Sequence, residues 1–264
     1  MRERRGLMYS GIDVSVYQGD IQWKKVKEAG VEFAMLRAGW SWYQGGMNID
    51  KNFQAYAAGA GEAGLPWGAY LYAYDKTPEA ARISARRLAQ VLAPYRPEYP
   101  VAYDIEDMQY LYQSRAENTA IAKAFLEELQ SLGFYVMLYT FTNFANGYLD
   151  MSQLSQFDLW VADHRAQVGY NGPYGMWQYS NSGRVDGISV NVDLDRAYKD
   201  YPVIIRAAGL NGFGTGGESG GDCQTRLQEL QEKLERLKEE QSALEADYRQ
   251  AQTRIENALR ALEG

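Results

Sequence analysis

Strand-like and helix-like segments alternate along residues 8–195, and this order is the feature that most limits the possible folds. The strand candidates are bounded by turn residues; they are residues 8–15, 33–40, 67–74, 100–107, 135–140, 158–163, 176–180 and 190–195. The helix candidates lie between or after the early strands, and most carry N-caps or terminal glycines; they are residues 21–29, 50–63, 78–92, 118–132 and 143–149. Strands joined through helices make right-handed crossovers, so the pattern predicts a parallel sheet.

The number of strands favours a closed barrel over an open sheet. Eight strands with five crossover helices fit a TIM-like (β/α)5(β)3 barrel of the α/β class, in which the last three strands have short connections. An open, doubly wound sheet is the alternative. No GxGxxG motif follows the first strand, so the sequence gives no support for the nucleotide site that such a sheet often carries.

The composition changes abruptly after the predicted barrel. All six tryptophans and 20 of the 21 tyrosines lie before residue 202, and residues 209–221 hold seven glycines, which is typical of a flexible linker. Beyond them, apolar residues are spaced alternately by three and four, which predicts a single long coiled-coil helix. We therefore divide the chain into an N-terminal tail (1–7), a catalytic barrel (8–207), a Gly-rich linker (208–222) and a coiled-coil oligomerisation helix (223–264).

The predicted coiled coil leaves the pairing partner open. In a parallel homodimer Lys233 would face Lys238 and Glu240 would face Glu245, and both contacts would be repulsive. Antiparallel pairing or a different helical partner avoids this repulsion. Homo-oligomerisation is the expected role, because two linked barrels would bind a polymeric substrate with avidity. Cys223 is either a free thiol or an interchain disulfide partner in a parallel pair.

Charge and residue counts exclude several classes of function. A net charge of −7, from 34 acidic and 27 basic residues, argues against a nucleic-acid partner. One cysteine and one histidine, His164, cannot supply a Cys/His zinc cage and argue against a Ser-His-Asp triad, so we expect no metal and no cofactor. No apolar run reaches about 18 residues, so no membrane span is expected, and the N-terminus lacks the apolar region of a classical signal peptide.

Four carboxylates fall where a barrel carries its chemistry, at the C-terminal ends of strands. Asp104 and Glu106 end the fourth strand, and their spacing of two places both on one face, with Cα atoms about 6.6 Å apart. Asp13 ends the first strand and Asp193 lies in the last, so barrel closure makes them neighbours. Carboxylates after strands often only cap helices. Acids in an otherwise apolar strand are costly, however, and mutual repulsion raises the pKa of at least one of them, as a general acid requires.

Aromatic residues gather at the same predicted rim. They are Trp40, Trp42, Tyr70, Tyr72, Tyr74, Tyr103, Tyr139, Trp177 and Tyr179. Aromatic faces together with carboxylates are typical of a carbohydrate-binding cleft. Because neighbouring residues of a strand point to opposite faces, up to half of these rings belong to the core in this interpretation.

A set of short motifs, in order and at matching spacing from about Tyr9 to Ala197, resembles glycoside hydrolase family 25, the lysozyme-like N-acetylmuramidases. The motifs are Gly11-Ile12-Asp13-Val14-Ser15, Gln18-Gly19-Asp20-Ile21-Gln22-Trp23, Arg37-Ala38-Gly39, Asp50-x-x-Phe53, Gly68-Ala69-Tyr70, Asp104-Ile105-Glu106, Trp160-Val161-Ala162, Trp177-Gln178-Tyr179 and Val192-Asp193-Leu194. The resemblance implies a flattened barrel of eight strands and five helices. It also implies cleavage of the β-1,4 bond between N-acetylmuramic acid and N-acetylglucosamine in peptidoglycan.

The resemblance also implies roles for single residues. Glu106 matches the general acid and Asp104 the second acid of the Asp-x-Glu motif, while Asp13 and Asp193 match the two remaining carboxylates of the cleft. The residues expected to bind the sugars are Tyr70, Tyr103, Tyr139, Trp177, Tyr72 and Trp40. Arg37 is interpreted as an ion-pair partner inside the barrel. Val16 and Leu71 depart from the family pattern, because many members carry histidine at these two positions, and we expect altered cleft detail there.

Hydrolysis needs an acid for the leaving oxygen and a group that stabilises the oxocarbenium-like centre. A carboxylate could attack, could activate water, or could orient the substrate's own acetamido group. The resemblance favours the last route, with retention and Asp104 as orienting base, although the spacing of the carboxylates fits either outcome. The alternative function is a non-catalytic glycan-binding barrel on an oligomeric coiled-coil scaffold. In the enzyme interpretation the protein is made in the cytoplasm without a classical signal peptide and acts, like an endolysin, on the bacterial cell wall.

Overall fold

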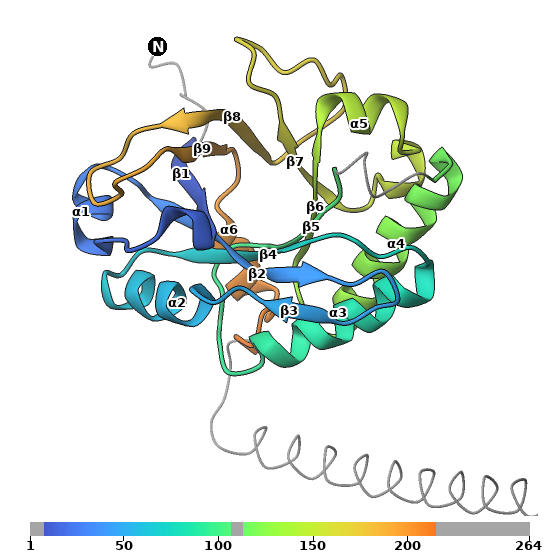
Figure 1. Cartoon of the computed structure of the whole chain (residues 1–264), viewed down its shortest axis with the longest axis horizontal. Coiled ribbons are helices and arrows are strands. Elements are labelled where there is room, and N and C mark those ends of the chain that lie inside the picture. Colours follow the sequence, from blue (N-terminus) through green and yellow to red (C-terminus); the bar gives the residue numbers. More distant parts are fainter. Residues whose placement is uncertain (1–7, 107–112, 215–264) are drawn as a thin grey trace, which may run out of the picture. The chain divides into compact units, whose positions relative to one another are not determined.

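The computed structural model describes residues 8–106 and 113–214. Its nine strands form one sheet in the order β1-β9-β8-β7-β6-β5-β4-β2-β3, and β1 also pairs with β2, so eight strands close into a barrel and β3 lies outside the ring (Figure 1). The closed barrel confirms the predicted fold class and excludes the open sheet. The strands are β1 Tyr9–Val14, β2 Phe33–Ser41, β3 Met47–Ile49, β4 Trp67–Tyr72, β5 Val101–Asp104, β6 Val136–Phe141, β7 Asp158–Ala162, β8 Met176–Gly183 and β9 Val192–Ala197.

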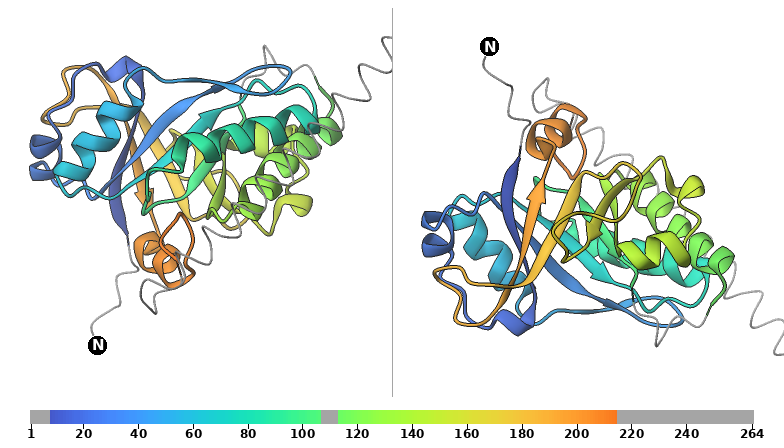
Figure 2. Two further views of the ribbon diagram at one scale, coloured as in Figure 1. Left: turned by 90° about the horizontal axis from the view of Figure 1, so that it is seen from below. Right: turned by 90° about the horizontal axis from the view of Figure 1, so that it is seen from above.

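Six helices are described with the strands. They are α1 Trp23–Glu28, α2 Phe53–Glu62, α3 Pro78–Leu92, α4 Arg115–Ser131, α5 Thr142–Gly147 and α6 Tyr201–Ala207, with short 3₁₀ turns at Val16–Gln18 and Met151–Leu154. α3 and α4 lie side by side against one flank of the barrel (Figure 2). The caps explain where these two begin: Thr77 Oγ1 accepts the Ala80 N–H at 3.1 Å, and Ser114 forms a capping box with Glu117.

Two features of the sheet differ from the prediction. Six neighbouring pairs of the barrel are parallel, but β9 is antiparallel to both β8 and β1. The expectation of a wholly parallel sheet was therefore wrong for β9, because the short connection from β8 allows only a hairpin. β3 was not predicted. It pairs antiparallel with the end of β2 through a turn in which Gly45 and Gly46 have φ values of 94° and 92°, which favour glycine.

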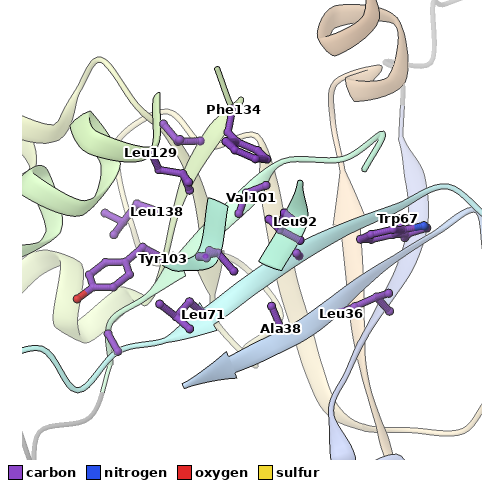
Figure 3. Packing of buried hydrophobic residues seen from close by; sticks show 14 of the residues in the cluster. Leu36, Ala38, Trp67, Leu71, Leu92, Val101, Tyr103, Leu129, Phe134 and Leu138 are labelled. Atoms are coloured by element: carbon purple, nitrogen blue, oxygen red, sulfur yellow. The ribbon is translucent and has the colours of Figure 1, made fainter. Parts of the chain in front are cut away.

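Alternation along the strands separates two cores. Inside the barrel, Phe33, Met35, Trp160 and their neighbours form one buried cluster. On the outer face, side chains of the same strands pack against the helices, and Figure 3 shows part of this layer, including Leu71, Leu92, Val101, Tyr103, Leu129 and Leu138. α6 closes the amino-terminal end of the barrel, since its Tyr201 packs against Tyr99 and Tyr135, which precede β5 and β6.

The chain after α6 remains part of the barrel unit for several residues. The side chain of Asn211 is buried; its Oδ1 accepts the Tyr135 N–H at 2.9 Å, and its Nδ2 donates to the carbonyls of Pro97 and Tyr99 at 2.8 and 3.1 Å. Residues 208–214 were predicted to belong to the flexible linker, and these contacts correct that assignment. The tail (1–7), the rest of the linker and the coiled coil (223–264) lie outside the described residues. Within the described part of the chain, no helix combines the length and apolarity needed to cross a bilayer.

Candidate active site

One row of side chains crosses five neighbouring strands near the carboxyl ends of the barrel. Each member is the register partner of the next: Trp40, Tyr72, Asp104, Tyr139 and Trp160. Partners in register point to the same face, so Asp104, the last residue of β5, is flanked by two tyrosines on the inner side of the barrel. Its side chain is only 5% exposed.

Glu106 follows two residues later, just beyond the strand, and is partly exposed. The residue between the two acids, Ile105, is fully buried in the outer cluster. The acids therefore lie on the inner side, as the period of two predicts.

All four predicted carboxylates gather around one phenol. Burial raises the pKa of Tyr139 well above its usual value, and the negative charges of Glu106, Asp104, Asp13 and Asp193 raise it further. Asp104 is the register partner of Tyr139, and Gln178 bonds to both Tyr139 and Asp13, which is itself the register partner of Asp193. The acids therefore lie together at the carboxyl end of the barrel, which we call the mouth. Tyr139 stays a neutral donor there, and its OH donates to Gln178 Oε1 at 3.2 Å.

Asp13 and Asp193 are register partners between β1 and β9, which confirms the expected pairing. The structure adds a third acid, Asp195, which is fully buried and accepts the Trp160 Nε1–H at 2.8 Å. Burial raises the pKa of Asp13 well above its usual range, and the charges of Asp195 and Asp193 raise it further; burial also raises the pKa of Asp195. The carboxyl of Asp13 is hydrogen-bonded to both partners, so at least one of the three acids keeps a proton near neutral pH.

Gln178 connects this acid cluster to the rest of the mouth. Its Nε2 donates to Asp13 Oδ2 at 2.8 Å, and its Oε1 accepts from Tyr139 and lies 3.0 Å from His164 Nε2. Sequence reasoning missed Gln178, His164 and Asp195. The Trp-Gln-Tyr motif and the spacing of two between Asp193 and Asp195 were available signals, whereas His164 had none, because it follows β7 in a loop.

A cavity of about 380 Å³ opens beside the row, at the ends of β1, β2 and β4. Its lining consists of Val16, Tyr17, Arg37, Trp40, Tyr72 and Tyr74. Arg37 is held by Asp50, whose Oδ2 lies 2.8 Å from both Nε and a terminal nitrogen of the guanidinium, and this confirms the expected ion pair. The guanidinium also lies over the rings of Tyr17 and Trp40, at 5.2 and 5.7 Å from their centroids. The cavity is therefore lined mainly by aromatic rings, and the charge of Arg37 is neutralised by Asp50.

Four of the six predicted sugar-binding aromatics lie on the inner side. They are Trp40, Tyr70, Tyr72 and Tyr139. Tyr70 lies among the acids, because burial raises its pKa and the charges of Asp13, Asp104 and Asp193 raise it further, while Arg37 lowers it.

The other two aromatics point the opposite way, which corrects the prediction. Tyr103 is fully buried in the outer layer (Figure 3). Its ring stacks on Phe125 at 4.0 Å, and its OH donates to Asp75 at 2.7 Å. Trp177 is the register partner of Arg196, which lies over its ring at 5.3 Å, and its Nε1 donates to the Asp163 carbonyl. Both rings sit one residue away from an inward-facing side chain, so alternation turns them outward.

Among the residues described here, no group of three or more histidine, cysteine, aspartate or glutamate side chains is arranged to hold a metal ion. The arrangement is suited instead to acid–base chemistry. The carboxyl groups of the mouth differ in their surroundings, some buried and some partly exposed. Such differences separate the pKa values of an acid and a base.

Comparison with known families agrees with this arrangement. The sequence profile of Glycosyl hydrolases family 25 matches residues 12–188. The chain belongs to this family. The family-25 region contains Asp13, Asp104 and Glu106, while Asp193 and Asp195 follow directly after it.

Individual relatives support the assignment. The chain is similar to the autolytic lysozyme of Clostridium acetobutylicum, with 32% identity over 188 residues that cover 70% of this chain and 54% of that protein. Among solved structures it is similar to the bacterial lysozyme of Streptomyces coelicolor, with a TM-score of 0.59, 25% identity and coverage of 81% and 99%. It also shares the fold of the autolysin LytC from Streptococcus pneumoniae, solved with a synthetic peptidoglycan ligand (TM-score 0.66, 24% identity, coverage 72% and 47%). The chain thus spans about half of two of these relatives.

Proposed function

We propose that this protein is a peptidoglycan hydrolase that cleaves the β-1,4 bond between N-acetylmuramic acid and N-acetylglucosamine. The observation that carries the proposal is the mouth of the barrel, where the charges of Asp13, Asp104, Glu106 and Asp193 all act on Tyr139 in a family-25 chain. The names of its relatives, which are lysozymes and an autolysin solved with a peptidoglycan ligand, support this substrate.

In the proposed mechanism, Glu106 protonates the leaving glycosidic oxygen. Its position just beyond β5, partly exposed at the rim, lets it reach a bound glycan. Asp104, held deeper between Tyr72 and Tyr139, orients the acetamido group of the substrate, whose carbonyl oxygen attacks the anomeric carbon. Water then opens the intermediate, with Glu106 acting as base, so the configuration is retained.

The remaining residues shape the cleft. Asp13 and Asp193 set its charge, and Gln178 fixes Asp13 relative to Tyr139. Trp40 and Tyr72 line the cavity of about 380 Å³ and offer flat faces for sugar rings. Their placement next to Asp104 in the register would bring a bound sugar to the acids.

The decisive experiment replaces the proposed acid. We expect Glu106→Gln to lose nearly all release of reducing sugar from purified bacterial walls, while thermal unfolding and binding to insoluble peptidoglycan stay unchanged. Removing a general acid costs typically 10²–10⁴-fold in rate. Glu62→Gln, an exposed substitution on α2, is the matched control and should keep full activity. Full activity of Glu106→Gln would refute the assignment of the acid.

The same assay tests the alternative function. A wild-type protein that binds walls but releases no reducing sugar would be a glycan-binding barrel. The stereochemical route needs a separate measurement: proton NMR of the first product formed from soluble glycan should show the β-anomer. An initial α-anomer would mean inversion and would exclude the substrate-assisted route.

We further propose that residues 223–264, which lie outside the described residues, join chains into homo-oligomers that bind the wall with avidity. Analytical ultracentrifugation of the full chain against a chain that ends at Gly214 tests this. Equal monomer masses would remove the proposal. The site of action in this interpretation is the bacterial cell wall, after synthesis in the cytoplasm.

A further inference from the structure

A further buried acid, Asp75, lies outside the mouth and has no part in the proposed mechanism. Asp75, in the segment between β4 and α3, is fully buried. Tyr103 donates its OH to Oδ2 at 2.7 Å, and the Ser84 hydroxyl lies 2.6 Å from Oδ1. The side chain of Ser41 also hydrogen-bonds to it. Residues from β2, α3 and β5 therefore converge on one carboxyl group.

The segment that carries Asp75 also builds the cavity. Tyr72 and Tyr74 both line it. The Tyr74 N–H donates to Ser41 Oγ at 2.8 Å, so the serine that contacts Asp75 also holds the backbone of a cavity residue. The Ala73 N–H donates to the Asp104 carbonyl at 2.8 Å. Asp75 is thus connected to the cavity wall and, through Tyr103 and Ala73, to the backbone around Asp104.

The hydrogen bonds of Ser84 differ between the protonated and the ionised form of Asp75. Ser84 has one hydroxyl proton, but its oxygen lies within bonding distance of both Asp75 Oδ1 at 2.6 Å and the Gly46 carbonyl at 3.0 Å. A protonated Asp75 donates to Ser84 Oγ, and Ser84 then donates to Gly46. An ionised Asp75 accepts the hydrogen bond of the Ser84 O–H, so the Ser84 bond to the turn between β2 and β3 is lost.

The surroundings favour the protonated form. Burial raises the pKa of Asp75 to about 6, although the bonds from Ser84, Tyr103 and Ser41 lower it. Of these three partners only Tyr103 titrates, and burial together with the charge of Asp75 raises its pKa well above the usual value, so it stays neutral. Lys76, the next residue, directs its Nζ over the Tyr43 ring at 5.3 Å.

We propose that Asp75 is a positioning residue: its protonated carboxyl fixes the Trp40–Tyr72–Tyr74 wall of the cavity in the form that binds glycan. Ionisation removes the bond from Ser84 to Gly46, so the turn between β2 and β3 keeps only its own backbone bonds, and the wall is held less firmly. The inference rests on the proposed function, since it assigns the cavity to the substrate. The carboxyl touches neither substrate nor reacting atoms, so its effect is on binding.

The test separates binding from chemistry with two variants of Asp75. Asn mimics the protonated acid, because its NH₂ donates to Ser84 while its oxygen accepts from Tyr103; Ala does neither. We expect the wild-type KM for soluble peptidoglycan fragments to rise roughly fivefold between pH 5 and pH 7.5, the effect of about one hydrogen bond. The KM of Asp75→Asn should stay at the low value over this range, and that of Asp75→Ala should not change with pH, because alanine has no group that titrates there. The pH dependence of kcat should be the same in all three.

Asp186→Asn, an exposed substitution, is the control and should follow the wild type. The proposal is overturned if either Asp75→Asn or Asp75→Ala shows the wild-type rise in KM with pH. A second measurement separates this from the proposed function: the Kd of the N-acetylglucosamine tetramer, from tryptophan fluorescence at both pH values. Binding with the expected pH dependence but without cleavage would refute only the hydrolase. Absence of binding would overturn the role of Asp75 as well.

Discussion

Asn211 provides a quantitative test of where the barrel ends. It lies in the stretch that the glycine content assigns to a linker, yet its side chain is 1% exposed and makes three hydrogen bonds to the segments before β5 and β6. Its backbone has a φ of 54°, in the left-handed region that asparagine tolerates better than alanine. If the stretch belongs to the barrel, Asn211→Ala must destabilise the whole unit.

The expected magnitude follows from these contacts. Three buried hydrogen bonds contribute about 1 kcal/mol each, and alanine in the left-handed region costs about 1 kcal/mol more, so the free energy of unfolding should fall by roughly 4 kcal/mol. For a unit of this size 1 kcal/mol corresponds to about 2–4 °C, so the Tm should fall by about 8–16 °C. Asn181→Ala, at an exposed position of β8, is the control and should stay within about 0.5 kcal/mol of the wild type.

Urea and thermal unfolding of the chain that ends at Gly214 measure both substitutions. A chain that ends at Ala208 should be destabilised at least as much as Asn211→Ala, because it loses the same bonds. A fall of less than about 1 kcal/mol for Asn211→Ala, or equal stability of the two truncated chains, would refute the conclusion that residues 208–214 belong to the barrel.

Three further predictions follow from single contacts. Asp13 and Asp195 have raised pKa values, so their contribution to stability is complete at acid pH and lost as the pH rises; Asp195→Asn should therefore reduce the fall in Tm between pH 5 and pH 8. Arg165 lowers the pKa of Asp163, so the contribution of Asp163 is present at neutral pH and lost on acidification; Arg165→Ala should lower the Tm at pH 7, and by less at pH 3, whereas Arg87→Ala should not. Gly11 leaves no room for a Cβ beside the Phe33 ring, so Gly11→Ala should cost about 1–3 kcal/mol in urea unfolding.

The barrel was predictable because its determinants are local. The eight barrel strands overlap the segments chosen from alternation and turn residues, and α3 begins and ends at the predicted residues. The errors also have local causes. The capping box of Ser114 and Glu117 starts α4 three residues before the predicted Asn118, and Gly45-Gly46 marks the hairpin that holds β3. Both signals are visible in the sequence.

The candidate site was only partly predictable, because it depends on partners that are distant in sequence. The positions of Asp104 and Glu106 follow from a spacing of two. The pairing of Asp13 with Asp193 follows from closure of the barrel, and the register confirms it. The bond between Asp13 and Gln178 joins residues 165 positions apart, and that between Trp160 and Asp195 depends on the exact register of β9. No local pattern specifies such pairs.

Tyr103 and Trp177 show that the type of a residue at the rim does not determine whether its side chain points into the barrel or toward the helices. Tyr103 and Trp177 resemble the other rim aromatics in type and in position along their strands, and only the parity of each position distinguishes inside from outside. Once one residue of a strand is assigned to the inner or the outer face, alternation assigns the others: if Asp104 faces the mouth, Tyr103 must face the helices. The same rule explains how an outer acid can influence the mouth. Tyr103 holds Asp75 with its hydroxyl while its neighbour Asp104 faces the cleft, so one peptide unit of β5 joins the two networks.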